Sequence, residues 1–312
     1  MYKRQLSEID KISESFGSLL WLAFSGGEIF LRDDLVGISR TFYKNNTPAI
    51  MLFPTNGLLP EVIKERIGEV LRDCPNSIIA VKLSMDGLYN RHDEVRNTQG
   101  SFEKTMQTYG LLQGLIHKYP NFELGINTVF CSENQDEMET IIDFVKEMKE
   151  IKTHTISRIR GNLSDETFKQ VDPQKYENAI ARLESNLKDK TSGTYRFKGA
   201  KVKAAQDILQ RRLIHMTTQE QKRQIPCYAG RLNIVMHENG DIFPCEILSK
   251  KMGNIRDADY DIQRILSSKS ARDIIRSIAR NECYCTHECY FITNILFNPQ
   301  LYPALLKEYV QL

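Results

Sequence analysis

Short apolar runs alternate with longer amphipathic stretches through the first half of the chain. Each run has the length of a buried strand, and the stretches between them repeat apolar residues at the spacing of one helical face. The runs predict five strands, at residues 19–24, 48–53, 77–83, 122–130 and 154–160. The stretches predict five helices, at residues 7–16, 33–46, 60–71, 102–118 and 134–148, the first of them ahead of every strand.

Strands that alternate with helices predict a parallel sheet covered by helices, either barrel-like or doubly wound. In both arrangements, ligands bind at the carboxyl ends of the strands. Polar residues and glycines occur at or near the carboxyl ends of all five predicted strands, so the sequence predicts a binding site along that edge. The segments are Ser25-Gly26-Gly27-Glu28, Thr55-Asn56-Gly57, Ser84-Met85-Asp86-Gly87, Asn127-Thr128 and Arg158-Ile159-Arg160-Gly161.

The turn after the first predicted strand combines two adjacent glycines, Gly26 and Gly27, with the carboxylate of Glu28. Adjacent glycines let the backbone turn sharply and let a ligand approach the main chain closely. The carboxylate adds an acceptor for a hydrogen-bond donor such as an ammonium group. By itself this combination also suits an ordinary turn between a strand and a helix, so its interpretation depends on the rest of the chain.

Composition and charge narrow the class of protein. The chain has 312 residues, of which 41% are hydrophobic and 26% charged, as is typical of a folded globular protein. Its 42 basic and 40 acidic side chains leave a formal charge of +2, so the basic face of a nucleic-acid-binding protein is not indicated. No apolar run approaches the roughly 18 residues that a membrane span needs. We therefore expect a cytoplasmic protein with no membrane or nucleic-acid partner.

The last third of the chain differs from the first half. Charged helical stretches lead from Asp172 to about His215, and residues 219–223 are predicted to form a solvated linker whose charges carry no functional weight. The turn pair Asn239-Gly240 then predicts a β-hairpin. We therefore expect three parts, a βα domain at residues 1–165, a helical connection at 166–224 and a cysteine-rich domain at 225–312.

Five of the seven cysteines lie in this last part, whereas Cys74 and Cys131 are isolated and are expected to be small buried hydrophobes. Clustered thiols in a reducing compartment favour metal ligation over disulfides. Zinc would accept four thiolates, or three thiolates and His287, while an iron-sulfur cluster needs four thiolates. We expect His287 to be an exposed loop residue rather than a ligand. The clustered thiols are Cys227, Cys245, Cys283, Cys285 and Cys289.

Several short motifs together resemble the radical SAM superfamily. In the βα part they are Gly26-Gly27-Glu28, Ser84-x-Asp86-Gly87, His92-Asp93-Glu94-Val95-Arg96 and Gly100-Ser101-Phe102. The tail is similar to the SPASM domain or its shortened twitch form, which holds auxiliary 4Fe-4S clusters. Its motifs are Cys227, Gly240-Asp241-Ile242-Phe243-Pro244-Cys245, Gly253-Asn254-Ile255 and the C-x-C-x3-C that begins at Cys283.

The resemblance implies an α/β fold, a partial (βα) barrel of radical SAM type followed by a small α+β domain. In that family a 4Fe-4S cluster reductively cleaves S-adenosyl-L-methionine, and the resulting 5'-deoxyadenosyl radical abstracts a hydrogen from the substrate. The family's contacts with this cofactor are carried over by position. They are Gly26, Gly27 and Glu28 for the methionine ammonium, Ser84 and Asp86 for the ribose or carboxylate, Asn127 for the ribose and Arg96 for the carboxylate.

The chain departs from the family pattern at two places. Asn97 follows Arg96, where the family usually has glycine. The defining C-x3-C-x2-C motif, which ligates the SAM cluster after the family's first strand, does not occur in the sequence. As written, the chain is not expected to cleave S-adenosylmethionine. We expect a missing first strand and an incomplete chain from an active parent rather than a degenerate homologue. A second 4Fe-4S cluster is expected only if a missing N-terminal segment supplies the motif.

Three functions are compatible with this sequence. The first is a radical SAM oxidoreductase, or a truncated form of one, that uses an electron donor and modifies a peptide, sugar or other small molecule. Its one auxiliary cluster would be held by Cys227, Cys245, Cys289 and either Cys283 or Cys285. The second is a non-catalytic accessory protein whose cysteines hold a structural metal. The third, a zinc-dependent barrel hydrolase, lacks an evident set of histidine and carboxylate ligands at the strand ends.

Overall fold

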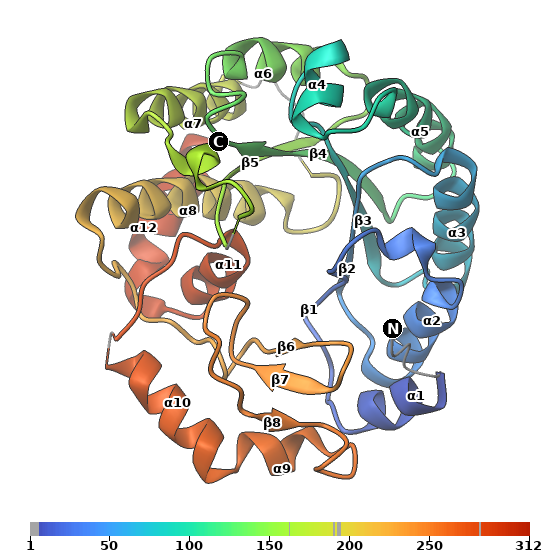
Figure 1. Cartoon of the computed structure of the whole chain (residues 1–312), viewed down its shortest axis with the longest axis vertical. Coiled ribbons are helices and arrows are strands. Elements are labelled where there is room, and N and C mark those ends of the chain that lie inside the picture. The colour runs from blue at the N-terminus through green and yellow to red at the C-terminus, as the bar shows by residue number, and fades with distance from the viewer. Residues whose placement is uncertain (1–5, 162, 190, 192–194, 281) are drawn as a thin grey trace. The chain divides into compact units, whose positions relative to one another are not determined.

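The computed structural model describes residues 6–161, 163–189, 191, 195–280 and 282–312 (Figure 1). The chain divides into two compact units. The barrel unit is Ser18–Ala204, and the cysteine-rich unit combines Met1–Gly17 with Ala205–Gln311. Each unit has a hydrophobic core of its own.

The barrel unit is built on a sheet whose strands follow the order β1-β2-β3-β4-β5 and are all parallel. This topology confirms the predicted α/β partial barrel. Parallel pairing places the carboxyl ends of all the strands at one edge, as the polar strand ends require. The strands are β1 (Trp21–Ala23), β2 (Ile50–Thr55), β3 (Ile78–Ser84), β4 (Phe122–Phe130) and β5 (Thr153–Arg158).

Helices cover the outer face of this sheet (Figure 1). Alternate residues of β2 and β3, such as Phe53 and Val81, are completely buried in the core beneath them, as the period of two in a strand dictates. The short helix α4 was not predicted from the hydrophobic pattern. The elements are η1 (Ile29–Leu31), α2 (Leu35–Asn46), α3 (Pro60–Asp73), α4 (Tyr89–Val95), α5 (Ser101–Ile116), α6 (Met138–Glu147), η2 (Glu166–Lys169) and α7 (Pro173–Lys188).

The cysteine-rich unit contains a small antiparallel sheet among short helices. The predicted hairpin is present, and Gly240 adopts a φ of 92° in its turn, a conformation that favours glycine. None of the helices in the described part of the chain is long and apolar enough to cross a membrane. The elements are α8 (Ala200–Glu220), β6 (Val235–Met236), β7 (Asp241–Phe243), β8 (Gly253–Asn254), α9 (Ile262–Leu266), α10 (Lys269–Ala279), α11 (Glu288–Leu296), η3 (Pro299–Leu301) and α12 (Tyr302–Gln311).

The first helix, α1 (Leu6–Glu14), belongs to the cysteine-rich unit although it begins the chain. Ile12 is fully buried in a cluster with Ile242 and Ile262. On the polar side of the helix, the carboxylate of Glu8 accepts a hydrogen bond from Arg256 Nε at 2.6 Å. An apolar anchor and an ion pair thus attach α1 to residues that follow it by more than two hundred positions in the sequence.

The observed division differs from the expected parts at 1–165, 166–224 and 225–312. Residues before Ser18 join the C-terminal part, for the packing reason just given. The expected connection is itself divided, because Tyr176 and Ile180 of α7 are buried in the core of the barrel unit, while Leu213 of α8 packs in the cysteine-rich unit. The boundary between the units therefore lies within α8, at Ala204 and Ala205.

The packing of α1 predicts that Ile12→Ala weakens the cysteine-rich unit. Removing a buried isoleucine side chain costs about 2–5 kcal/mol of unfolding free energy. The matched control is Leu6→Ala, because Leu6 lies on the same helix and is 43% exposed. Amide hydrogen exchange measures the effect locally, and exchange at residues 253–266 should accelerate in the Ile12 variant alone. Unchanged exchange there would contradict the assignment of α1 to this unit.

Candidate functional site

Glu28 joins the ends of the first two strands of the barrel unit. Its carboxylate accepts hydrogen bonds from the Thr55 hydroxyl at 2.9 Å, the Asn56 amide at 2.8 Å and the Phe30 amide at 3.1 Å. A carboxylate has about four acceptor positions, so three donors leave room for one more. Beside it Gly26 and Gly27 are exposed, and nothing lies within 4 Å of the position a Cβ would take at either glycine. The main chain here is open to a ligand.

Ser84 and Asn127 lie side by side at the carboxyl edge of the sheet. Ser84 is the last residue of β3, and its register partner Asn127 lies within β4. The Met85 amide donates a hydrogen bond to the Asn127 carbonyl at 3.0 Å. Their neighbours Leu83 and Ile126 are completely buried, whereas both polar residues are only partly buried. Because successive side chains in a strand point to opposite faces, Ser84 and Asn127 share the sheet face opposite that core.

Asp86 is 5% exposed and has a protein partner at each carboxylate oxygen. Oδ1 accepts a hydrogen bond from the Val129 amide at 2.7 Å, and Oδ2 lies 2.7 Å from Arg96 Nε. Burial raises the pKa of Asp86, while the Arg96 guanidinium and the Val129 amide oppose that rise. Both oxygens thus serve contacts inside the protein, and one of those contacts holds the guanidinium of Arg96.

Two residues of the same motif build the turn around Asp86. His92 accepts a hydrogen bond at Nδ1 from the Asp86 amide, at 3.1 Å. Asp93 accepts from the Gly100 amide at 2.6 Å and the Phe102 amide at 2.8 Å, at the start of α5. These contacts tie α4 to the end of β3 and to α5, so the motif from His92 to Arg96 holds its arginine in place.

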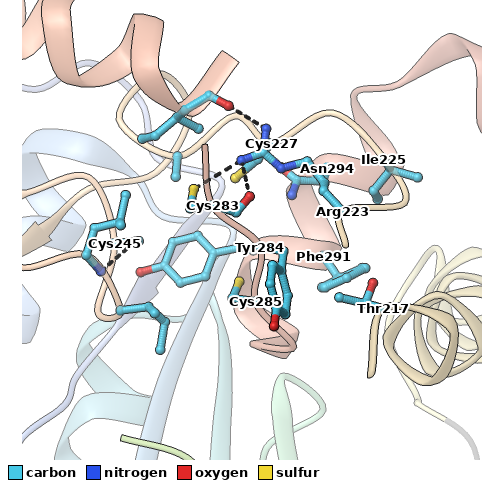
Figure 2. A pocket seen from close by; sticks show the side chains of 15 residues that line it. Thr217, Arg223, Ile225, Cys227, Cys245, Cys283, Tyr284, Cys285, Phe291 and Asn294 are labelled. Atoms are coloured by element: carbon cyan, nitrogen blue, oxygen red, sulfur yellow. Dashed lines mark hydrogen bonds between the residues drawn. The ribbon is translucent and has the colours of Figure 1, made fainter. Parts of the chain in front are cut away.

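Four of the clustered cysteines line one cavity of about 40 Å³ in the cysteine-rich unit (Figure 2). Much of the remaining lining is apolar and includes Ile225, Ile278 and Phe291. Cys289 is exposed and is not among the lining residues, so the structure separates it from the other clustered thiols. The lining cysteines are Cys227, Cys245, Cys283 and Cys285.

Burial and the neighbouring thiols raise the pKa of two thiols in this cavity. Burial, together with a smaller contribution from the neighbouring thiols, raises the pKa of Cys285 to about 11. The same causes raise the pKa of Cys245. A metal that binds here must therefore displace protons from buried thiols, and its affinity will fall with falling pH.

The donor set fits an iron-sulfur cluster, because four thiolates in an apolar cavity are the ligands that such a cluster takes. In the described ranges of the chain, no three histidine, cysteine or carboxylate side chains lie close enough to hold a single metal ion. The four thiols line one cavity, so they also match the donor set of a tetrahedral zinc, whose sulfur ligands lie about 2.3 Å from the metal.

Comparison with known proteins adds independent observations. Residues 227–290 match the SPASM family model, described as an iron-sulfur cluster-binding domain. The structure of native anSMEcpe with bound AdoMet and Kp18Cys peptide is similar at a TM-score of 0.61 and 16% identity, over 99% of this chain and 91% of that one. Streptococcus suis SuiB is similar at a TM-score of 0.59 and 15% identity, over 88% of this chain and 62% of that one. No curated protein matches the sequence significantly.

This is the fold of a radical SAM protein with a SPASM domain. The structural similarity over 99% of the chain decides the fold, and the SPASM match includes the cavity, since all four lining cysteines lie within residues 227–290. In this fold, the residues expected to contact the cofactor lie toward the carboxyl edge of the sheet, at or after strand ends, within β4 for Asn127 and at the end of α4 for Arg96.

His287 of the SPASM domain corrects a prediction. It was expected to be an exposed loop residue, yet it is 4% exposed and caps α11 by accepting the Cys289 amide at Nδ1, at 3.3 Å. Its Nε2 lies 2.5 Å from Oε2 of Glu246. The imidazole therefore links the segment that carries Cys285 to the residue after Cys245. The expectation failed because the carboxylate partner is 41 positions away in the sequence.

The environment of His92 predicts an acid-sensitive stability of the radical SAM fold. Burial lowers the pKa of His92 from 6.5 to about 4 in the folded protein, so the unfolded chain binds the proton first as the pH falls. Unfolding free energy should therefore drop between about pH 6.5 and pH 4, by up to about 3 kcal/mol. His92→Gln, which cannot take up that proton, should remove this part of the pH dependence in chemical denaturation. His117→Gln is the control, and an unchanged pH profile in the His92 variant would contradict the assignment.

Proposed function

We propose that this protein binds S-adenosylmethionine at the carboxyl edge of the barrel sheet and one 4Fe-4S cluster in the SPASM cavity, in the service of radical modification of a peptide. The observation that carries the proposal is the four-thiol cavity inside the segment that matches an iron-sulfur cluster-binding domain. The radical SAM fold of the chain supports the cofactor, and a related structure was solved with AdoMet bound.

The edge of the sheet offers complementary groups for the methionine part of S-adenosylmethionine. Glu28 retains acceptor capacity beside the open main chain at Gly26 and Gly27, which suits the ammonium group. Arg96 presents a guanidinium, which suits the carboxylate. The side chain of Arg96 is 30% exposed, so it is accessible while it stays paired with Asp86.

Ser84 and Asn127 provide hydroxyl and amide groups for the ribose. Their positions as register neighbours on two adjacent strands fix the spacing of these groups. In a chain that also carries a C-x3-C-x2-C segment, a cluster held there would supply the electron that cleaves S-adenosylmethionine, the radical precursor. The residues of this chain bind and orient the cofactor, and the parallel sheet keeps them at one edge.

Peptide is the substrate class that we favour among peptides, sugars and other small molecules. One similar structure, anSMEcpe, was solved with both AdoMet and a Kp18Cys peptide bound. An electron donor is also required, since reductive cleavage consumes one electron. The decisive assay uses this chain extended by a C-x3-C-x2-C segment, which should release 5'-deoxyadenosine under reducing conditions. A loaded, extended chain that releases none would favour the accessory protein.

Cysteine substitution tests the ligand set of the cluster. We expect Cys→Ser at each of the four lining positions to lower the iron bound after anaerobic reconstitution, from about four irons per chain, because each variant removes one thiolate. Cys289→Ser is the matched control and should retain iron, because that thiol lies outside the cavity lining. Loss of iron in the Cys289 variant would instead support the ligand set expected from the sequence. The four test positions are Cys227, Cys245, Cys283 and Cys285.

Asp86→Asn tests whether Asp86 acts through Arg96. The variant keeps an acceptor for the Val129 amide but loses the charge that pairs with the guanidinium. A charged hydrogen bond is worth about 1.5–3 kcal/mol, so calorimetric affinity for S-adenosylmethionine should fall about 10-fold to 100-fold. The control is Glu94→Gln in α4, the helix that ends at Arg96, since the Glu94 side chain is 63% exposed.

A double-variant cycle completes this test. In an Arg96→Leu background, Asp86→Asn should cause no further loss of affinity if the aspartate acts only by holding the arginine. Additive losses would show that Asp86 contacts the cofactor directly, as the family resemblance implies. Circular dichroism of each variant verifies that the barrel unit remains folded.

The alternative is an accessory protein whose cysteines hold a structural metal. It is compatible with the same four cavity thiols, which are also the ligands of structural zinc. Metal binding would then stabilise the cysteine-rich unit without catalysis. Metal analysis after expression in the presence of both iron and zinc distinguishes the two, since zinc in place of iron would support the alternative.

A further inference from the structure

Arg223 lies in the SPASM cavity, although its segment was predicted to be a solvated linker. The residue is partly buried and lines the cavity together with Cys283 (Figure 2). Its Nη2 lies 2.8 Å from the Cys283 carbonyl oxygen and 3.1 Å from Cys283 Sγ. The expectation for residues 219–223 was therefore wrong at this position. A guanidinium donates directly to one of the four cavity sulfurs.

Backbone carbonyls hold this guanidinium in place. Nη1 donates a short hydrogen bond to the carbonyl of Ile278, in the last turn of α10. Carbonyls at a helix C-terminus lack partners within the helix and accept such donors readily. With Nη1 on α10 and Nη2 on the Cys283 carbonyl, the plane of the guanidinium is fixed. The N–H directed at Cys283 Sγ is therefore oriented by contacts that do not involve the sulfur.

A positive charge at this position should affect the reduction potential of a bound cluster. Hydrogen bonds to the sulfurs and nearby charge are among the factors that set the reduction potential of an iron-sulfur cluster. A guanidinium remains positively charged at every working pH, so it stabilises the more negative, reduced state. The apolar residues Ile225, Ile278 and Phe291 in the lining reduce screening by water and strengthen this interaction.

We propose that Arg223 raises the reduction potential of the cluster held by the SPASM cavity, by donating a hydrogen bond to Cys283 Sγ. The inference rests on the cluster binding proposed above. The redox step is a one-electron reduction of [4Fe-4S]2+ to [4Fe-4S]+ by a low-potential donor, for which dithionite serves in the experiment. No covalent bond forms or breaks in this step, and no proton is transferred.

The test compares three reconstituted variants of the full chain with the wild type. Arg223→Gln removes the charge, and Arg223→Lys keeps it. The control is Arg231→Gln, because Arg231 is exposed, close to Cys227 in the sequence and not among the residues that line the cavity. Potentials are measured by EPR-monitored titration with dithionite, alongside iron content and thermal midpoint. We expect a lower potential in Arg223→Gln, partial recovery in Arg223→Lys and the wild-type value in Arg231→Gln.

The possible failures are distinguishable. A wild-type chain that takes up no iron would overturn the proposed function. Full iron in Arg223→Gln with an unchanged potential would overturn the role of Arg223 and leave the cluster in place. If Arg223→Gln does not load iron, the contact is tested by pulsed EPR of wild-type protein labelled with 15N at its arginine guanidinium nitrogens. Coupling of a 15N nucleus to the reduced cluster supports the contact, and its absence overturns it.

Discussion

Parallel hydrogen bonding between strands is the constraint on which the candidate site depends. The ladder between β3 and β4 sets Ser84 opposite Asn127, and the ladder from β1 to β2 brings the turn at Glu28 to Thr55 and Asn56. Because every strand of this sheet runs in the same direction, polar groups separated by about a hundred residues reach one edge. A shift of one residue in register would turn Ser84 to the buried face and Leu83 to the open one.

Two carboxylates at this edge, the buried Asp86 and the partly buried Glu28, hold segments of the protein together. Burying Asp86 costs free energy that the Val129 amide and the Arg96 guanidinium offset. Glu28 is satisfied in a similar way by a hydroxyl and main-chain amides. In both places a carboxylate proposed to bind or position the cofactor also connects segments of the protein. The same contacts that hold the edge together therefore orient the groups proposed to meet S-adenosylmethionine.

Much of this arrangement could be predicted from the sequence. Strands, helices and polar strand ends follow local rules of periodicity, so the barrel sheet and its edge were predictable from short segments. The partners of Ile12, Arg223 and His287 were not, because each packs or bonds with residues far away in the chain. A polar residue in a short connecting segment has the same local sequence pattern whether its hydrogen bonds go to water or to carbonyl groups at a helix end. The placement of Cys289 outside the cavity lining likewise depends on the folded backbone, and the sequence alone favours Cys289 as a ligand over one of Cys283 and Cys285.

The most direct test of this account is the Mössbauer spectrum of the chain reconstituted anaerobically with 57Fe and sulfide. We expect about four irons per chain, in the quadrupole doublet of an oxidised 4Fe-4S cluster held by thiolates. Zinc bound in place of iron, or iron bound only adventitiously with no cluster signal, would contradict it. In that case the SPASM cavity would hold a structural metal, and the proposed pairing of cluster and S-adenosylmethionine would fail.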